Sequence, residues 1–217
     1  MAQARVFIVD DHPLVREWLA NLLRQQPDLE VCGQADSAPA ALAAIRAAAP
    51  DVAVIDLSLK GGSGIDLIKD MQAEGLRTAS VVLSMHEETY YAERALRAGA
   101  RGYVMKREST GRIVEAIRQV LRGGIYAGPD VMARLAERMV GRTRAPTEGA
   151  AALSDREIEV FRRLGEGQTT RQVATAMGVS VKTVQAYCAR IKDKLSLSSG
   201  AELVREAVRW VENERRS

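Results

Sequence analysis

Residues 5–13 read Arg5-Val6-Phe7-Ile8-Val9-Asp10-Asp11-His12-Pro13, a short apolar run that passes directly into two acidic residues. The apolar part has the length and the Val/Ile content of a buried β-strand, and the proline suits the first turn of a following helix. No Gly-rich turn separates the two, which disfavours a dinucleotide-binding oxidoreductase. The stretch therefore predicts a strand that delivers two carboxylates to its carboxyl end.

The same unit, a short apolar run followed by an amphipathic stretch, occurs five times in residues 1–124. The expected strands are residues 6–10, 29–35, 52–57, 80–85 and 102–106, and the expected helices are residues 13–25, 39–48, 65–74, 89–98 and 110–122. Five βα units in succession predict an α/β fold, a doubly wound, flavodoxin-like parallel sheet with helices on both faces. Right-handed crossovers place the carboxyl ends of the strands along one edge, where such folds bind ligands.

Polar side chains follow the ends of four expected strands. Asp10 and Asp11 end the first strand, Asp56 the third, Ser84 the fourth and Lys106 the fifth. Carboxylates gathered at one edge repel one another, and a divalent cation with oxygen ligands, such as Mg²⁺, removes that conflict. A lone aspartate would be a turn former and a lone lysine a solvated charge. Together, these residue types predict a site at which a carboxylate receives a phosphoryl group.

Charge and cysteine content restrict the class of protein. Residues 1–124 hold 15 Lys/Arg and 16 Asp/Glu, whereas residues 125–217 hold 16 and 12, so nucleic-acid binding is sought in the C-terminal part. Two distant cysteines, Cys32 and Cys188, predict neither a disulfide nor a metal cluster, and we expect both thiols to be buried. Without a long apolar run or a signal-peptide pattern, we expect a cytoplasmic protein with no membrane partner.

A domain boundary is predicted after residue 124, where the alternation of strands and helices stops. Residues 125–152 are expected to form a linker with one short amphipathic helix at 129–140. The remainder of this linker is rich in Arg, Thr, Pro, Gly and Ala and offers almost nothing to bury. Residues 153–217 then form the second domain.

Helix signals are clear in residues 153–217. Ser154 with Glu157 forms a capping box, Thr169 or Thr170 caps a second helix, and Ser180 caps a third. The expected helices cover residues 154–164, 170–177, 181–195 and 201–211. A helix, a tight Gly-containing turn and a longer helix predict a small all-α helix-turn-helix domain.

The expected helix after Ser180 has two distinct faces. Apolar residues at alternating spacings of three and four form a stripe that we expect to be buried, namely Val181, Val184, Cys188, Ile191 and Leu195. The opposite face suits the major groove, where Gln185 matches adenine and Ala186 and Ala189 match thymine methyl groups. Phosphate contacts are expected from Lys182, Thr183, Arg190, Lys192 and Lys194. The alternative is a basic helical bundle that binds protein.

The βα part of the chain resembles the receiver domain of two-component response regulators. The resemblance rests on Asp10-Asp11, Asp56, Ser84 and Lys106 at the strand ends. It implies that Asp56 takes a phosphoryl group from a histidine kinase with Mg²⁺ bound, that Ser84 moves toward this group, and that Tyr103 changes rotamer. The expected metal ligands are Asp10, Asp11, Asp56 and the backbone carbonyl of Ser58.

The helical part resembles the LuxR-type helix-turn-helix of the NarL/FixJ class of response regulators. The matching stretches are Leu153-Ser154-Asp155-Arg156-Glu157, Gly165-Glu166-Gly167, Val181-Lys182-Thr183-Val184, Ile191 and Lys194-Leu195. Tyr187 stands where the family usually has His. The resemblance implies dimeric binding to paired half-sites of double-stranded DNA. Residues of the last helix either join the dimer contact or fill the core, and they are Leu203, Val204, Ala207 and Trp210.

We therefore predict a non-enzymatic transcription regulator in which phosphorylation of Asp56 by a histidine kinase controls homodimerisation and promoter binding, with RNA polymerase an open further partner. One alternative is a DNA-binding regulator that acts without phosphorylation. A hydrolase of the haloacid dehalogenase type also phosphorylates an aspartate at a strand end. That pattern has a second acid two residues on, where this chain has Ser58.

Overall fold

The computed structural model describes residues 3–59, 62–84, 89–107, 110–129, 131–133, 136 and 152–216. The chain divides into two compact units, residues 1–140 and 141–217. Most of the helix expected at 129–140 and most of the linker expected at 125–152 lie outside the described residues, and the described residues 129, 131–133 and 136 are helical. Within the described ranges, no helix combines the length and the apolar character that crossing a membrane requires.

The first unit contains a five-stranded sheet in the order β2-β1-β3-β6-β7. Its strands are β1 (Ala4–Val9), β2 (Leu29–Ala35), β3 (Val52–Asp56), β6 (Ala79–Ser84) and β7 (Gly102–Met105). All neighbouring strands pair in parallel, which confirms the predicted doubly wound sheet. A short antiparallel pair, β4 (Ser58–Leu59) with β5 (Gly62–Ser63), was not predicted, because strands of two residues carry no periodicity.

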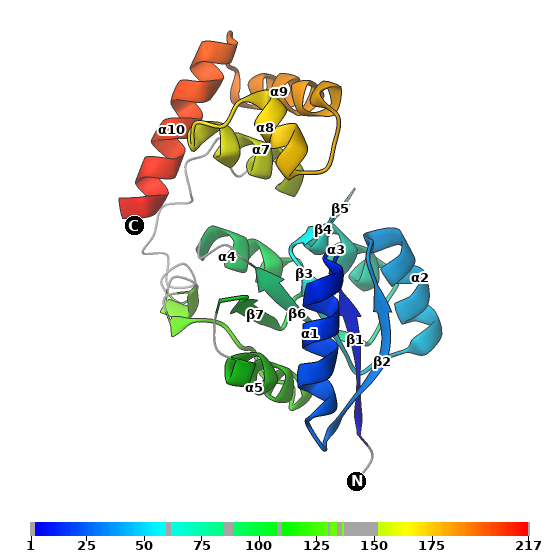
Figure 1. Ribbon diagram of the computed structural model, residues 1–217. Coiled ribbons are helices and arrows are strands. Elements are labelled where there is room, and N and C mark those ends of the chain that lie inside the picture. The colour runs from blue at the N-terminus through cyan, green and yellow to red at the C-terminus, as the bar shows by residue number, and fades with distance from the viewer. Residues whose placement is uncertain are drawn as a thin grey trace. The chain divides into compact units, whose positions relative to one another are not determined.

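Helices cover both faces of this sheet (Figure 1). They are α1 (Pro13–Arg24), α2 (Ala38–Ala48), α3 (Gly64–Ala73), α4 (Thr89–Arg97) and α5 (Thr110–Leu121). On one face, Val6, Ile8 and Val54 join buried residues of α1 and α5 in a single core cluster. Alternation along the strands turns Phe7 and Ile55 to the other face, which α2, α3 and α4 cover. The two-sided burial explains why the strands read as continuous apolar runs.

The segment after α5 extends the edge of the sheet beyond β7. Tyr126 forms a parallel bridge with Gly102, its backbone N donates to the carbonyl of Arg101, and its carbonyl accepts from the backbone N of Tyr103. The Tyr126 side chain belongs to the same core cluster as α1 and α5. Residues just beyond Gly124 are therefore part of the first unit, although the paired glycines suggest a boundary there.

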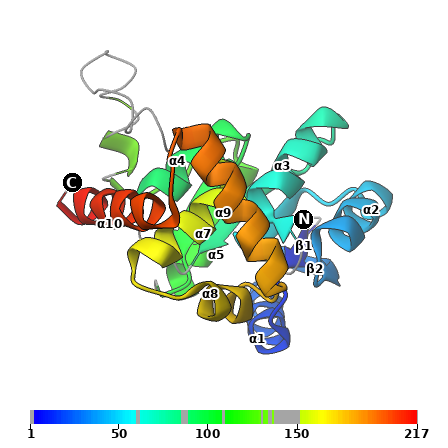
Figure 2. The ribbon, with the colours of Figure 1, turned by 90° about the horizontal axis from the view of Figure 1, so that it is seen from above.

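The described part of the second unit has four helices: α7 (Asp155–Gly165), α8 (Thr170–Ala176), α9 (Val181–Leu195) and α10 (Gly200–Arg216). Figure 2 shows α9 as one unbroken helix that begins beside α8. Ser154 and Thr169 each form a capping box, and the Ser180 hydroxyl accepts from the backbone N of Thr183. The predicted caps therefore set the starts of three helices.

The core of the second unit includes most of the apolar face of α10. Phe161 of α7 and Trp210 lie with their ring centroids 5.9 Å apart. Leu203, Ala207 and Trp210 are buried, whereas Val204 is 42% exposed. Of the α10 residues considered for a dimer contact, only Val204 is thus available on the surface of one chain.

Burial differs from the expectation at four residues, of which Leu195 is half-buried rather than buried. Val181 is 36% exposed, because it belongs to the first turn of α9, and periodicity does not reveal whether a neighbouring element covers that turn. Cys32 and Cys188 are half-buried rather than buried. Cys32 lies on β2, which is an edge strand of the sheet and is therefore less covered than the central strands. Burial nevertheless raises the pKa of both thiols.

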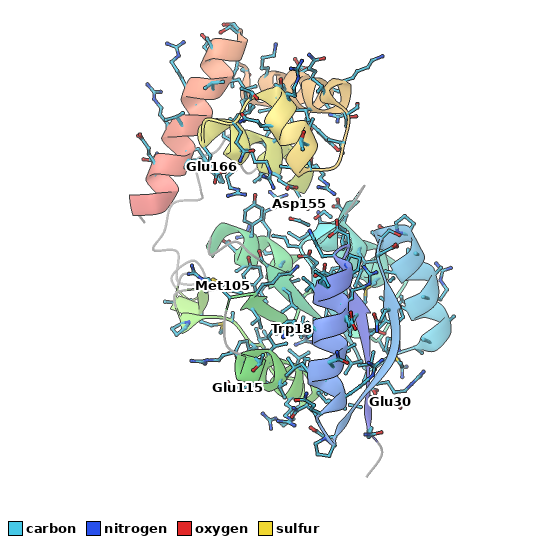
Figure 3. All side chains as sticks on the ribbon, viewed as in Figure 1. Trp18, Glu30, Met105, Glu115, Asp155 and Glu166 are labelled. Carbon is cyan, nitrogen blue, oxygen red and sulfur yellow. The ribbon has the colours of Figure 1, made fainter. Side chains whose placement is uncertain are left out.

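A close contact between α7 and α10 predicts a large effect of one methyl group. Glu166, which is labelled in Figure 3, directly follows α7. The last residue of α7 is Gly165, and a Cβ at this position would lie 2.4 Å from the carbonyl oxygen of Ala207. We expect Gly165→Ala to lower the free energy of unfolding of the second unit by about 1–3 kcal/mol. Calorimetry, with hydrogen exchange to identify the unit that melts, measures this change.

The matched control for this substitution is Gly200→Ala. A Cβ at Gly200 would meet nothing within 4 Å, and this residue opens α10. Alanine there is expected to be neutral or slightly stabilising, because it reduces the entropy of the unfolded chain. If Gly165→Ala and the parent chain melted at the same temperature, α7 and α10 could move apart without a loss of stability.

Candidate functional site

Three strand ends bring two acids and a lysine together. Asp56 is the last residue of β3 and Asp10 follows β1, and these residues are 4% and 2% exposed. Lys106 follows β7, and its Nζ lies 2.6 Å from Asp10 Oδ2 and 2.9 Å from Asp56 Oδ2. The ammonium therefore bridges two buried carboxylates that come from separate strands.

Burial controls the charge of these groups. Burial raises the pKa of Asp56 to about 6, with the nearby Asp10 carboxylate adding to the effect and Lys106 opposing it. For Lys106, burial favours the neutral amine, but the two carboxylates outweigh burial and raise the pKa of the ammonium above its ordinary value. Lys106 thus carries a fixed positive charge, whereas Asp56 takes up a proton just below neutral pH.

The acidic cluster has the ligand chemistry of a hard divalent cation. Ligand atoms of Asp10, Asp11, His12 and Asp56 all lie within 4.8 Å of one another. The buried Oδ1 of Asp11 has no hydrogen-bond partner, although His12 Nδ1 lies 2.7 Å away without the angle of a hydrogen bond. A buried carboxylate oxygen without a donor fits Mg²⁺, which prefers oxygen ligands. The fourth member of the cluster, His12, is exposed.

Ser84 and Ser58 lie on the same edge, whereas Tyr103 is the second of the four residues of β7. Ser84 is the last residue of β6, and its carbonyl accepts from the backbone N of Lys106 at 2.7 Å. Tyr103 of β7 is 4% exposed. The backbone N of Ser58 faces Asp56 Oδ1 at 3.5 Å, and a metal contact of its carbonyl stays a prediction.

One contact near the acids escapes sequence analysis. Arg16, on the first turns of α1, donates from Nη1 to the carbonyl oxygen of Asp10 at 2.6 Å. This contact ties the segment after β1 to α1 and so restrains the backbone of the acidic pair. Arg16 lies in α1 whereas Asp10 follows β1, so the periodicity of a single element does not indicate the contact.

The expected DNA-reading face of α9 is exposed. Lys182, Gln185, Ala186 and Ala189 all lie at the surface, and Lys192 is half-buried. Beneath this face, Val184 and Ile191 are fully buried. The helix thus presents two methyl groups and one carboxamide beside Lys182, and the small alanine side chains leave room for close approach to base edges.

Glu157 connects α7 to the flank of α9. Its carboxylate is 3% exposed, accepts from the backbone N of Ser154, and lies 2.7 Å from Lys194 Nζ and 3.5 Å from Arg190 Nε. Burial by itself raises the pKa of Glu157, but the hydrogen bonds from Lys194 and Ser154 together hold it below its ordinary value. Two expected phosphate contacts, Arg190 and Lys194, therefore already have a partner within their own unit.

Glu157→Gln isolates the charge of this carboxylate, because glutamine can still complete the capping box. We expect the substitution to lower the stability of the second unit at neutral pH by about 1 kcal/mol, since Lys194 is partly exposed to solvent. A depressed pKa adds stability above the ordinary value of 4.5, and this contribution is lost as pH falls through the lower folded value. Urea titrations should show the difference at neutral pH and not in strong acid. If the two chains differed equally in stability at neutral pH and in strong acid, the effect of Glu157 would not come from its charge.

Family models match both parts of the chain. The response regulator receiver domain matches residues 6–118, and the LuxR family of bacterial regulatory proteins matches residues 151–207. The first match covers the parallel sheet and the acidic edge, and the second covers α7, α8 and α9.

Individual relatives match over nearly their whole length. The chain is 34% identical over 200 residues to the transcriptional regulatory protein UhpA of Escherichia coli (strain K12), covering 92% of this chain and 95% of UhpA. It is also 34% identical over 205 residues to the response regulator GacA of Pseudomonas syringae pv. syringae, covering 94% and 95%. The solved complex of the two-component response regulator RcsB with DNA matches 96% of this chain and 99% of RcsB with a TM-score of 0.58 and 25% identity.

Proposed function

Because the chain belongs to the NarL/FixJ class of two-component response regulators, with a receiver domain and a LuxR-type DNA-binding domain, we propose that phosphorylation of Asp56 controls its binding to promoter DNA. We assign residues 1–124 to the receiver, with the edge contact of Tyr126 appended, residues 125–152 to the linker and residues 153–217 to the DNA-binding domain. A histidine kinase is the proposed phosphodonor.

The observation that carries this proposal is the bridge of Lys106 between Asp10 and Asp56. An isolated buried carboxylate would remain protonated and would be a poor nucleophile. Here the ammonium opposes the effect of burial, so that Asp56 ionises near neutral pH. The site therefore holds a reactive carboxylate and a fixed positive charge at one point.

The chemistry we propose is the transfer of a phosphoryl group from a histidine to Asp56. A carboxylate oxygen of Asp56 attacks the phosphorus of a phosphohistidine, a P–O bond forms, and the P–N bond breaks with its electron pair going to the imidazole. Lys106 is placed to pair with a phosphoryl oxygen in exchange for its contact with the Asp56 carboxylate. Ser84, at the neighbouring strand end, is the proposed donor of a hydrogen bond to another phosphoryl oxygen.

Asp10, Asp11 and Asp56, together with the carbonyl of Ser58, are the proposed ligands of Mg²⁺. When bound, this ion neutralises charge on the phosphoryl oxygens. The residues fit the ion because they offer clustered carboxylate oxygens, one of which is buried without a hydrogen-bond donor. His12 is not proposed as a ligand, because its imidazole suits softer metals and its side chain is 67% exposed.

The proposed output is dimeric binding to paired DNA half-sites. Gln185, Ala186 and Ala189 of α9 are the proposed base contacts, and the proposed phosphate contacts are Lys182, Thr183, Arg190, Lys192 and Lys194. A change at Ser84 and Tyr103 on phosphorylation is proposed to alter the surface near α4 and β7, and thereby dimerisation. RNA polymerase is a further candidate partner at the promoter.

The experiment that tests this function measures DNA affinity and molecular mass together. Duplexes are first selected from a randomised pool by the chain incubated with Mg²⁺ and acetyl phosphate, and their affinity is then measured with and without the phosphodonor. Light scattering on the same samples gives the oligomeric state. We expect tighter binding and a dimer with the donor, and neither in EDTA. A phosphorylated chain with unchanged affinity and mass would favour the regulator that acts without phosphorylation.

A further inference from the structure

An arginine and a tyrosine on one flank of α9 are stacked on each other. Arg190 Cζ lies 4.8 Å from the centroid of the Tyr187 ring, within the range of a cation–π contact. Tyr187 is half-buried, whereas the Arg190 side chain is 55% exposed. The ring therefore forms a fixed platform at the surface, and the guanidinium rests on it.

Glu157 restrains the same guanidinium from a second direction. Its Oε1 lies 3.5 Å from Arg190 Nε, and neither Nη nitrogen of Arg190 donates a hydrogen bond to any residue that the structure describes. The ring and the carboxylate thus fix the position of the guanidinium, while its two terminal donors stay available. A pair of parallel N–H donors in a fixed plane is the arrangement that binds a phosphate in bidentate fashion.

The neighbouring polar groups on this flank are used inside the unit. Lys194 Nζ donates to Glu157 Oε2 at 2.7 Å, and Thr183 Oγ1 lies 2.8 Å from Ser180 Oγ. Among the expected phosphate contacts on this flank, Arg190 therefore combines a fixed position with unpaired terminal donors in the described structure. The feature that distinguishes it is the aromatic ring beneath it.

We propose that Tyr187 is a positioning residue that holds the Arg190 guanidinium ready to bind a phosphate of the DNA backbone. This inference rests on the proposed DNA-binding function and assigns a role to a side chain outside the proposed contact set. A free arginine side chain loses rotamer entropy when DNA fixes it, and the stacked side chain has lost part of that entropy before binding. Tyr187 thereby increases affinity without needing a contact of its own with DNA.

The test compares full-length chains on a short duplex of randomised sequence, by fluorescence anisotropy over a series of NaCl concentrations. Such a probe reports phosphate contacts, which do not depend on base sequence. We expect Tyr187→Ala to weaken binding about two- to fivefold and Tyr187→Phe to leave it unchanged, because phenylalanine keeps the ring. Arg190→Ala should weaken binding and reduce the slope of log affinity against log salt by about one.

The double variants separate positioning from general damage. In the Arg190→Ala background, Tyr187→Ala should have no further effect, whereas in the Lys182→Ala background it should keep its full effect. Thermal melts check that each variant is folded. The inference would be overturned if Tyr187→Ala lowered DNA affinity equally with and without Arg190. It would also be overturned if Tyr187→Phe bound DNA as weakly as Tyr187→Ala. A parent chain that binds no duplex at low salt would overturn the DNA-binding function itself.

Discussion

Asp56→Asn is expected to abolish phosphorylation of the chain completely. With Mg²⁺ and acetyl phosphate, the intact mass of the parent chain should rise by one phosphoryl group, and the variant should gain none. The amide cannot act as the attacking carboxylate, and among the described residues Asp10 is the one other acid paired with Lys106. Asp66→Asn, which changes an exposed aspartate of α3, is the matched control and should be phosphorylated normally. An adduct on Asp56→Asn would place the acceptor elsewhere.

The same substitution should remove a pH dependence of stability in EDTA. The pKa of Asp56 is raised from 3.8 to about 6 by burial, so the folded chain binds more protons than the unfolded chain between these values. Stability therefore falls as pH rises through this interval, by at most roughly 3 kcal/mol. Asp56→Asn has no such carboxyl and should be the more stable chain at neutral pH. Urea titrations in acid and at neutral pH measure the difference, and parallel curves for both chains would contradict the raised pKa.

Mg²⁺ should reverse the loss of stability that rising pH causes in the parent chain. A bound divalent cation stabilises the ionised carboxylates, so it opposes the effect of burial on Asp56. The gain in stability on adding Mg²⁺ should therefore grow with pH and should be smaller in Asp56→Asn. This links the phosphoacceptor and the proposed metal site through a measurement that does not require phosphorylation.

The fold was largely predictable because each element has a local signal. The alternation of apolar runs with amphipathic stretches indicated the five parallel strands, and hydroxyl caps at Ser154, Thr169 and Ser180 set the starts of three helices. In each case a few neighbouring residues determine the outcome. The pair β4–β5 and the edge contact of Tyr126 depend on residues that lie outside the segment itself, so local patterns did not indicate them.

At the acidic edge, the sequence predicted which residue types meet but not how they pair. In the described structure Lys106 pairs with Asp10 and Asp56, whereas Asp11 pairs with His12. Which of the two acids meets the lysine depends on the register of β1 against the other strands. The same limit applies to Glu157, whose role as a cap is visible over three residues but whose contact with Lys194 spans 37 residues.

Gly64→Ala is expected to have the largest effect on stability, because α3 begins in direct contact with the strand that carries the phosphoacceptor. A Cβ on Gly64 would lie 2.2 Å from the carbonyl oxygen of Asp56 and 3.0 Å from Ile55 Cγ2. β3 is the central strand of the sheet and is paired on both sides, so it cannot move aside. We expect a loss of about 3 kcal/mol in the receiver, at the upper end of overpacking effects.

Two further glycine substitutions separate crowding from other effects of an added methyl group. Gly128→Ala meets no atom within 4 Å and should be nearly neutral, whereas Gly75→Ala adds only the strain of a left-handed backbone at φ +67 and should cost about 1 kcal/mol. Calorimetry ranks Gly64→Ala, Gly75→Ala and Gly128→Ala by their stability. The displaced Asp56 backbone should also slow phosphorylation by acetyl phosphate in Gly64→Ala alone, under conditions where all three chains are folded. If Gly64→Ala were phosphorylated at the parent rate, the position of the acceptor would depend on its contact with Lys106 rather than on the junction of β3 with α3.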